Sequence, residues 1–202
     1  MNKTNKSTIK AFFKKNYSQS WNYLKESKKF IYWIVFIFFI FVLIGFFAPI
    51  PKSIEEIILK FIKELLEKTQ GMSLIELINF IFINNLKVSF IGMAAGVFFG
   101  IFPVIECIGN GYLLGIIASK AVKADGIFTL WKLFPHGIFE LPAIFISLGF
   151  GLKLGFYFFQ NKKKKRSLGK TLFESLRAFV FIVIPLLIIA AIIEATFIFV
   201  LK

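Results

Sequence analysis

The chain has 202 residues, of which 57% are hydrophobic and 18% are charged, and its mean hydropathy is +0.78. Soluble domains have fewer apolar and more charged residues, so this composition excludes an ordinary soluble domain and predicts a multi-pass membrane protein. The single Cys107 and the single His136 exclude an internal disulfide and the zinc modules built from several Cys and His residues. The net charge of +14 lies in the flanks of apolar segments, which indicates membrane orientation and argues against nucleic-acid binding.

Five apolar segments predict an all-α fold, a polytopic membrane bundle of about five transmembrane helices in one domain that covers residues 30–202. A basic segment, residues 1–29, precedes this domain, and a basic loop, residues 160–177, lies inside it. The third apolar segment is short and rich in glycine, so it either spans the membrane or re-enters it from one side. The predicted spans are residues 30–48, 76–102, 105–122, 135–158 and 178–200.

Residues 53–70, between the first two spans, carry apolar and charged side chains on opposite faces, which predicts an amphipathic helix. Ser53 with Glu56 forms a predicted capping box at the start of this helix, and Ser73 with Glu76 repeats the pattern at the start of the second span. The amphipathic helix either lies flat on the membrane surface or packs on the protein as a lid.

Small residues recur every four positions along the second and third spans. Such a stripe lets another backbone approach closely, and it serves either packing within the chain or a homodimer face. The second span is also longer than the membrane requires, so it either tilts or breaks at Asn84 and Asn85. The stripe residues are Gly92, Gly96, Gly100, Gly111 and Gly115.

The distribution of charge predicts the orientation in the membrane. Residues 1–29 carry eight lysines and one acid, residues 160–177 carry seven Lys or Arg and one acid, and residues 51–77 carry four lysines and five glutamates. The positive-inside rule therefore places the N-terminus and the 160–177 loop in the cytoplasm. The amphipathic helix and, after five spans, the C-terminus are expected outside.

The fourth span opens with His136, one helical turn before Glu140. In the predicted orientation these residues, Asn85 and Glu194 share the outer half of the membrane, so we expect one polar cluster inside the bundle. Ionisable residues at this depth are costly and are by default candidates for function. Glu106 and Asn110 are expected nearer the opposite surface, unless the third segment re-enters. The full set of predicted cluster and packing residues is Asn84, Asn85, Lys87, Gly92, Gly96, Gly100, Glu106, Asn110, Gly111, Gly115, Gly137 and Pro142.

Three roles are open for this cluster. His136, Glu140 and Glu194 provide enough ligands for a divalent metal such as zinc. The cluster otherwise provides a pathway for a solute or proton, or it is structural, with Glu140 paired to Lys87. No nucleophile lies near the lone histidine in sequence and no phosphate-binding glycine loop is present, so catalytic residues are not predicted.

The order Asn84-Asn85, Gly92, Gly96, Asn110-Gly111, Gly115 and then His136-Gly137-Ile138-Phe139-Glu140-Leu141-Pro142-Ala143 resembles the stage II sporulation protein M family. The resemblance covers roughly residues 80–155. It implies a five-span membrane protein and, in sporulating bacteria, a scaffold that anchors peptidoglycan-degrading partners at the engulfing septum. It does not say what the histidine and the glutamate do chemically.

Two classes of function follow from the sequence. A non-enzymatic scaffold acts through surfaces, as a homodimer or with other membrane or cell-envelope proteins, and is the first expectation. A transporter, a channel or a metal-binding membrane protein instead needs the polar cluster itself. The lipid bilayer is a partner in either case.

Overall fold

The structure, a computed structural model, is all-helical and describes residues 3–160 and 167–200, with side chains at residues 8–131, 138, 140–160 and 167–200. Short 3-10 or π-helical segments join or extend several of the α-helices. The α-helices are α1 (Lys3–Phe47), α2 (Lys52–Thr69), α3 (Leu74–Ala94), α4 (Ile101–Asp125), α5 (Phe134–Gly155), α6 (Leu168–Ala178) and α7 (Ile184–Val200). The other segments are η1 (Ala95–Val97), η2 (Ile127–Leu133), η3 (Phe156–Phe159) and the π-helical η5 (Phe179–Val183).

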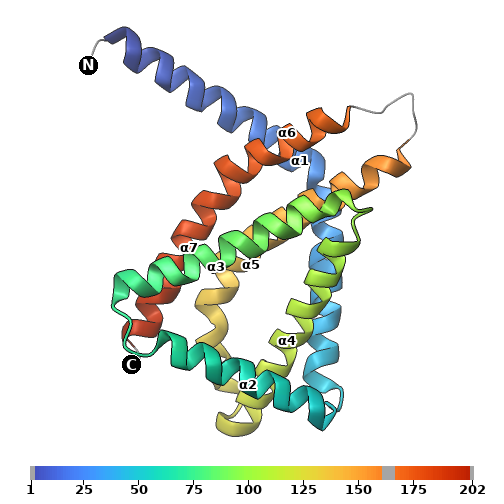
Figure 1. Cartoon of the computed structure of the whole chain (residues 1–202), viewed down its shortest axis with the longest axis vertical. Coiled ribbons are helices and arrows are strands. Elements are labelled where there is room, and N and C mark those ends of the chain that lie inside the picture. The colour runs from blue at the N-terminus through green and yellow to red at the C-terminus, as the bar shows by residue number, and fades with distance from the viewer. Residues whose placement is uncertain (1–2, 161–166, 201–202) are drawn as a thin grey trace.

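Five helical stretches of the described chain are long and apolar enough to cross a membrane, so the predicted multi-pass fold is confirmed. The third of them, α4, is a continuous helix about 37 Å long, enough for a full crossing rather than a re-entrant turn. α1 is about 67 Å long, more than twice the thickness of the hydrocarbon core. Its N-terminal part accordingly extends away from the other helices (Figure 1).

The second predicted span ends earlier than its sequence suggested. α3 runs unbroken through Asn84 and Asn85, so of the two alternatives, a tilt or a break, the break at these residues is not found, and the chain turns between η1 and α4. At this turn Phe99 has φ 56° and Gly100 has φ 73°, a left-handed conformation that glycine adopts without steric cost. Pro103 lies in the first turn of α4. The backbone N–H groups of this turn have no acceptor within the helix, so a proline here costs no hydrogen bond.

The two predicted capping boxes have different outcomes. At the start of α3, Ser73 Oγ accepts from the Glu76 N–H and the Glu76 carboxylate accepts from the Ser73 N–H at 2.8 Å, which confirms the box. The box at Ser53 is wrong, because α2 begins at Lys52 with Pro51 as its N-cap and without a side-chain cap. The helix thus starts two residues too early for Ser53 to cap it, since proline has a fixed φ that suits a helix start.

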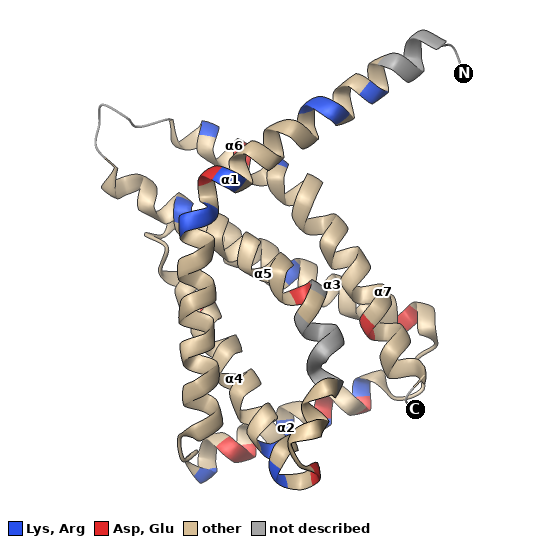
Figure 2. Cartoon of the chain, turned by 180° about the vertical axis from the view of Figure 1, so that it is seen from behind, with Lys and Arg blue, Asp and Glu red and all other residues tan. Residues whose placement is uncertain are grey.

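α5 forms the centre of the bundle, with 67% of the residues in its most apolar stretch buried, against 33% or less in the other four spans. α1 and α4 pack along each other, and α3 and α7 both pack on α5 (Figure 1). Figure 2 shows Lys and Arg gathered along α1 and α6 at one end of the bundle, and mixed with acidic residues on α2 at the other end.

The predicted glycine stripes are used within the chain. A Cβ at Gly96 of η1 would overlap the backbone of Gly151 in α5, and a Cβ at Gly115 of α4 would overlap the Val42 carbonyl in α1. Gly111 of α4 meets the backbone of α1 in the same way. Because these faces are already occupied, the glycines serve packing of the monomer, and a homodimer requires another surface.

Candidate functional site: a cavity with two carboxylates among the five spans

A cavity of about 290 Å³ lies inside the bundle and has α2 at its edge. Its wall combines aromatic and aliphatic side chains with two carboxylates and three amides. The lining residues are Phe38, Phe61, Leu65, Phe80, Ile81, Asn84, Asn85, Val88, Asn110, Leu113, Leu114, Ile117, Glu140, Leu141, Ile144 and Glu194.

The two carboxylates come from helices far apart in sequence. Glu140 lies in the first half of α5 and is 4% exposed, whereas Glu194 lies in the last half of α7 and is partly buried. α5 and α7 pack against each other, and this contact brings both acids to the same cavity. Among the described lining residues, these two glutamates are the ionisable side chains, so all the ionisable groups of the described wall are acidic.

The three amides come from α3 and α4. Asn84 and Asn85 line the cavity, as does Asn110, which the sequence placed near the opposite surface. Asn110 nevertheless reaches this cavity, because the predicted third span begins at residue 105 whereas α4 begins at Ile101. The earlier start moves Asn110 a full turn further from the end of its helix.

Two other predicted cluster residues lie elsewhere. Lys87 lines a separate hollow with Glu76 and Asn79, and no ion pair joins it to Glu140, although the structure describes both side chains. Glu106 packs against α3, where a Cβ at Gly92 would overlap its carboxylate. The Glu106 Oε1 atom is buried and has no hydrogen-bond partner among the described residues.

The predicted metal site includes His136, whose side chain lies outside the described residues, as does Gly137. Within the described part of the chain, no group of three or more His, Cys, Asp or Glu side chains is arranged to hold a metal ion. The site of His136, Glu140 and Glu194 therefore stays a prediction. Pro142 lies inside α5, two residues after Glu140, where it cannot donate a backbone hydrogen bond.

The sequence left open whether α2 lies on the membrane surface or packs on the protein as a lid, and the structure has features of both. Its Phe61 and Leu65 side chains line the cavity, as a lid would, while Ile57 is 67% exposed on the surface. Glu55 of α2 forms an ion pair with Lys120 of α4. The hydrogen bond from Lys120, and next its charge, lower the pKa of the Glu55 carboxyl below its usual 4.5.

A second polar group, near the opposite end of the bundle, was not predicted from the sequence. Lys153 of α5 lies 3.6 Å from the Glu26 carboxylate of α1, donates to Ser27 Oγ at 3.0 Å and stands 3.7 Å from the centre of the Tyr23 ring. The Tyr23 hydroxyl is hydrogen-bonded to Ser175 of α6 at 2.7 Å. The sequence feature that could have predicted this group is Lys153 itself, since a lysine inside an apolar span requires a partner.

The comparisons with known proteins agree with this architecture. The family model described as Stage II sporulation protein M matches residues 34–197, which include all the cavity residues. The chain belongs to this family. An uncharacterized protein of Methanocaldococcus jannaschii is 34% identical over 116 residues, which are 55% of this chain and 65% of that relative. No solved structure matches the chain significantly.

The region that matches the family model includes the cavity, but the match does not say what the cavity does. The matched region runs from the apolar part of α1 to the end of α7 and so includes both Glu140 and Glu194. The chain spans just under two thirds of the length of its Methanocaldococcus relative. A role for the cavity must therefore come from its own residues.

Proposed function

We propose that this member of the stage II sporulation protein M family is a membrane protein that binds and translocates a small organic cation. The observation that carries the proposal is the cavity shared by Glu140 and Glu194 among membrane-spanning helices. Ionisable residues inside membrane spans are rare, and intramembrane acids mark substrate pathways in transporters.

The size and lining of the cavity favour an organic ammonium group over a bare metal ion. Its volume of about 290 Å³ is roughly ten times the share of one water molecule in the liquid. Phe38, Phe61 and Phe80 supply aromatic surface, which attracts ammonium groups through the ring quadrupole. The amides of Asn84, Asn85 and Asn110 add hydrogen-bond acceptors for N–H groups.

Thermal unfolding of the purified protein in mild detergent tests this proposal. We expect putrescine or tetramethylammonium to raise the unfolding temperature, because a ligand that binds only the folded state stabilises it. Glu140→Gln and Glu194→Gln should each remove the shift, whereas Glu64→Gln, a change at an exposed residue of α2, should keep it. Equal shifts in all the variants, or none in the parent, would contradict the proposal. Stoichiometric zinc that is lost in Glu140→Gln would instead support the predicted metal site.

We also infer that the N-terminus is cytoplasmic and that α2 and the C-terminus lie outside. The charge distribution supports this orientation, since the basic N-terminal helix and α6 share one end of the bundle and α2 lies at the other (Figures 1 and 2). Lys63→Cys in α2 should react with a membrane-impermeant maleimide in intact cells. Lys163→Cys should react only after the membrane is opened, and labelling of position 163 from outside would reverse the orientation.

A scaffold function is the second candidate, and the N-terminal part of α1 favours it. This part extends away from the other helices (Figure 1), and its Trp21 side chain is 54% exposed. The Phe12 and Phe13 rings contact Phe181 of η5, with ring centres 6.4 and 6.1 Å apart, and are still at least half exposed. Exposed aromatic surface of this kind is suited to contacts between proteins, including a second copy of this chain. Trp21→Cys should then form a disulfide-linked dimer in native membranes more readily than Lys63→Cys, and equal linkage at both positions would count against it.

A further inference from the structure

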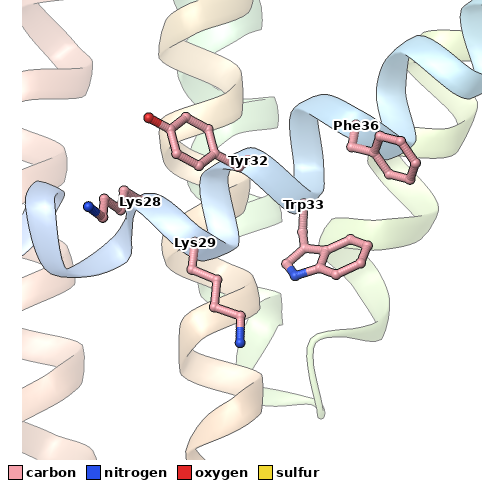
Figure 3. Close-up of a pocket in the computed structure, with 5 residues that line it drawn as sticks. All are labelled: Lys28, Lys29, Tyr32, Trp33 and Phe36. Atoms are coloured by element: carbon pink, nitrogen blue, oxygen red, sulfur yellow. The ribbon is translucent and has the colours of Figure 1, made fainter.

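We propose that α1 carries a binding site for the phosphate of an anionic phospholipid, formed by Lys28 and Lys29 with Tyr32, Trp33 and Phe36. This inference is independent of the cavity and of its ligand. These five residues line a hollow of about 390 Å³ on the outer surface of the helix (Figure 3).

The site combines two kinds of chemistry at one helical turn. Lys29 and Trp33 are four residues apart and project from the same side of α1, as Figure 3 shows. Lys28 and Tyr32 have the same spacing one position earlier. The ammonium groups therefore stand one turn before aromatic rings, which continue through the Trp33 contact with Phe36 at 5.9 Å. A phospholipid presents the same order, with a phosphate followed by acyl chains.

The depth of the hollow fits a lipid headgroup. The apolar part of α1, Phe30 to Phe47, is about 27 Å long, close to the thickness of the hydrocarbon core. Lys28 and Lys29 thus stand at its edge, and Trp33 is 52% exposed just inside it. Tryptophan and tyrosine favour this level of the membrane, and lysines there extend toward the headgroups.

Among the described residues that line the hollow, no acid balances the charge of the two lysines. The one acidic residue of α1 is Glu26, which forms its ion pair with Lys153 of α5 and does not line the hollow. Each basic residue near an anionic membrane surface strengthens binding by about five-fold. An anionic lipid therefore complements both the charge and the apolar part of the hollow, whereas a zwitterionic lipid complements only the latter.

Fluorescence quenching of Trp33 by brominated lipids tests the site directly. In a Trp21→Phe, Trp131→Phe background, Trp33 is the remaining tryptophan and reports the lipid beside it. In vesicles we expect brominated phosphatidylglycerol to quench Trp33 with an association constant at least about five-fold above that of brominated phosphatidylcholine. The double change Lys28→Gln, Lys29→Gln should bring this ratio to about one.

The matched control is Lys14→Gln, Lys15→Gln. This pair removes the same charge from the same helix, but Ser18 and Gln19 stand one turn later in place of aromatic residues. It should leave the ratio unchanged. An equal loss of preference in both double variants, or no preference in the parent, would overturn the proposal. Competition by inorganic phosphate alone at millimolar concentration would identify a free-anion site instead and would overturn it as well.

Discussion

Gly96 of η1, just after α3, and Gly151 of α5 are in backbone contact, so close that a Cβ at Gly96 would overlap the Gly151 carbonyl oxygen. A Cβ at Gly151 would in turn lie 2.7 Å from the carbonyl oxygen of Gly92 in α3, four residues before Gly96. α3 and α5 carry the Asn85 and Glu140 side chains of the cavity, so the glycine contact sets the distance between these two walls.

We predict that Gly96→Ala destabilises the monomer by at least about 2 kcal/mol, since neither backbone can move away without breaking helix packing. Unfolding in mixed detergent and SDS micelles measures this loss. Gly109→Ala is the matched control, because a Cβ there meets nothing within 4 Å, and it should stabilise α4 by about 0.5 to 1 kcal/mol. A Gly96→Ala protein of unchanged stability that lost a dimer would show that the stripe joins two chains.

Local features of the fold were predictable from the sequence, and the convergence of distant residues was not. The Ser73–Glu76 cap needs only four neighbouring residues, so its pattern sufficed to place the start of α3. Asn110 and Glu140 line the same cavity because of where α4 starts and how the helices pack, which a count of residues from the membrane surface does not give. Lys153 was missed for the same reason, because Ser27 lies 126 residues away from it in the chain.

The cluster around Lys153 gives a second prediction. Lys153→Met removes a hydrogen bond from a charged donor and the contact with the Tyr23 ring, so we expect a loss of about 1.5 to 3 kcal/mol in the free energy of unfolding. Lys25→Met is the control, since Lys25 is exposed and stands 6.0 Å from the centre of the Trp21 ring. Its effect should be within about 0.5 kcal/mol of zero. Similar losses in the two variants would mean that the buried lysine contributes no more than an exposed one.

The Glu55–Lys120 ion pair predicts a pH dependence of stability. Because Lys120 lowers the pKa of Glu55 in the folded protein, the pair stabilises the fold fully above pH 4.5 and this contribution is lost as the pH falls through the lower, folded pKa. Glu55→Gln should remove this part of the acid response, seen as a smaller drop in unfolding temperature on acidification. Glu67→Gln breaks an exposed pair with Lys63 on α2 alone and should keep the parental response. The same curve for Glu55→Gln and the parent would show that the pair does not hold α2 in place.

The position of α2 predicts that this helix controls access to the cavity. Phe61 lines the cavity wall from α2, whereas Leu66, five residues later on the same helix, is 64% exposed and does not line it. A cysteine in place of Asn110 reports access from the aqueous phase, since native Cys107 is fully buried and should stay unmodified in the parent. We expect Phe61→Ala to accelerate modification of Asn110→Cys by a small methanethiosulfonate reagent several-fold, because it removes a ring from the edge of the cavity, and Leu66→Ala to have little effect.

A cationic reagent should also react with Asn110→Cys faster than an anionic one, since the described ionisable lining groups are Glu140 and Glu194. Equal rates in the two alanine variants would mean that α2 is a surface helix rather than a lid, and equal rates for the two reagents would remove the electrostatic basis for a cationic solute.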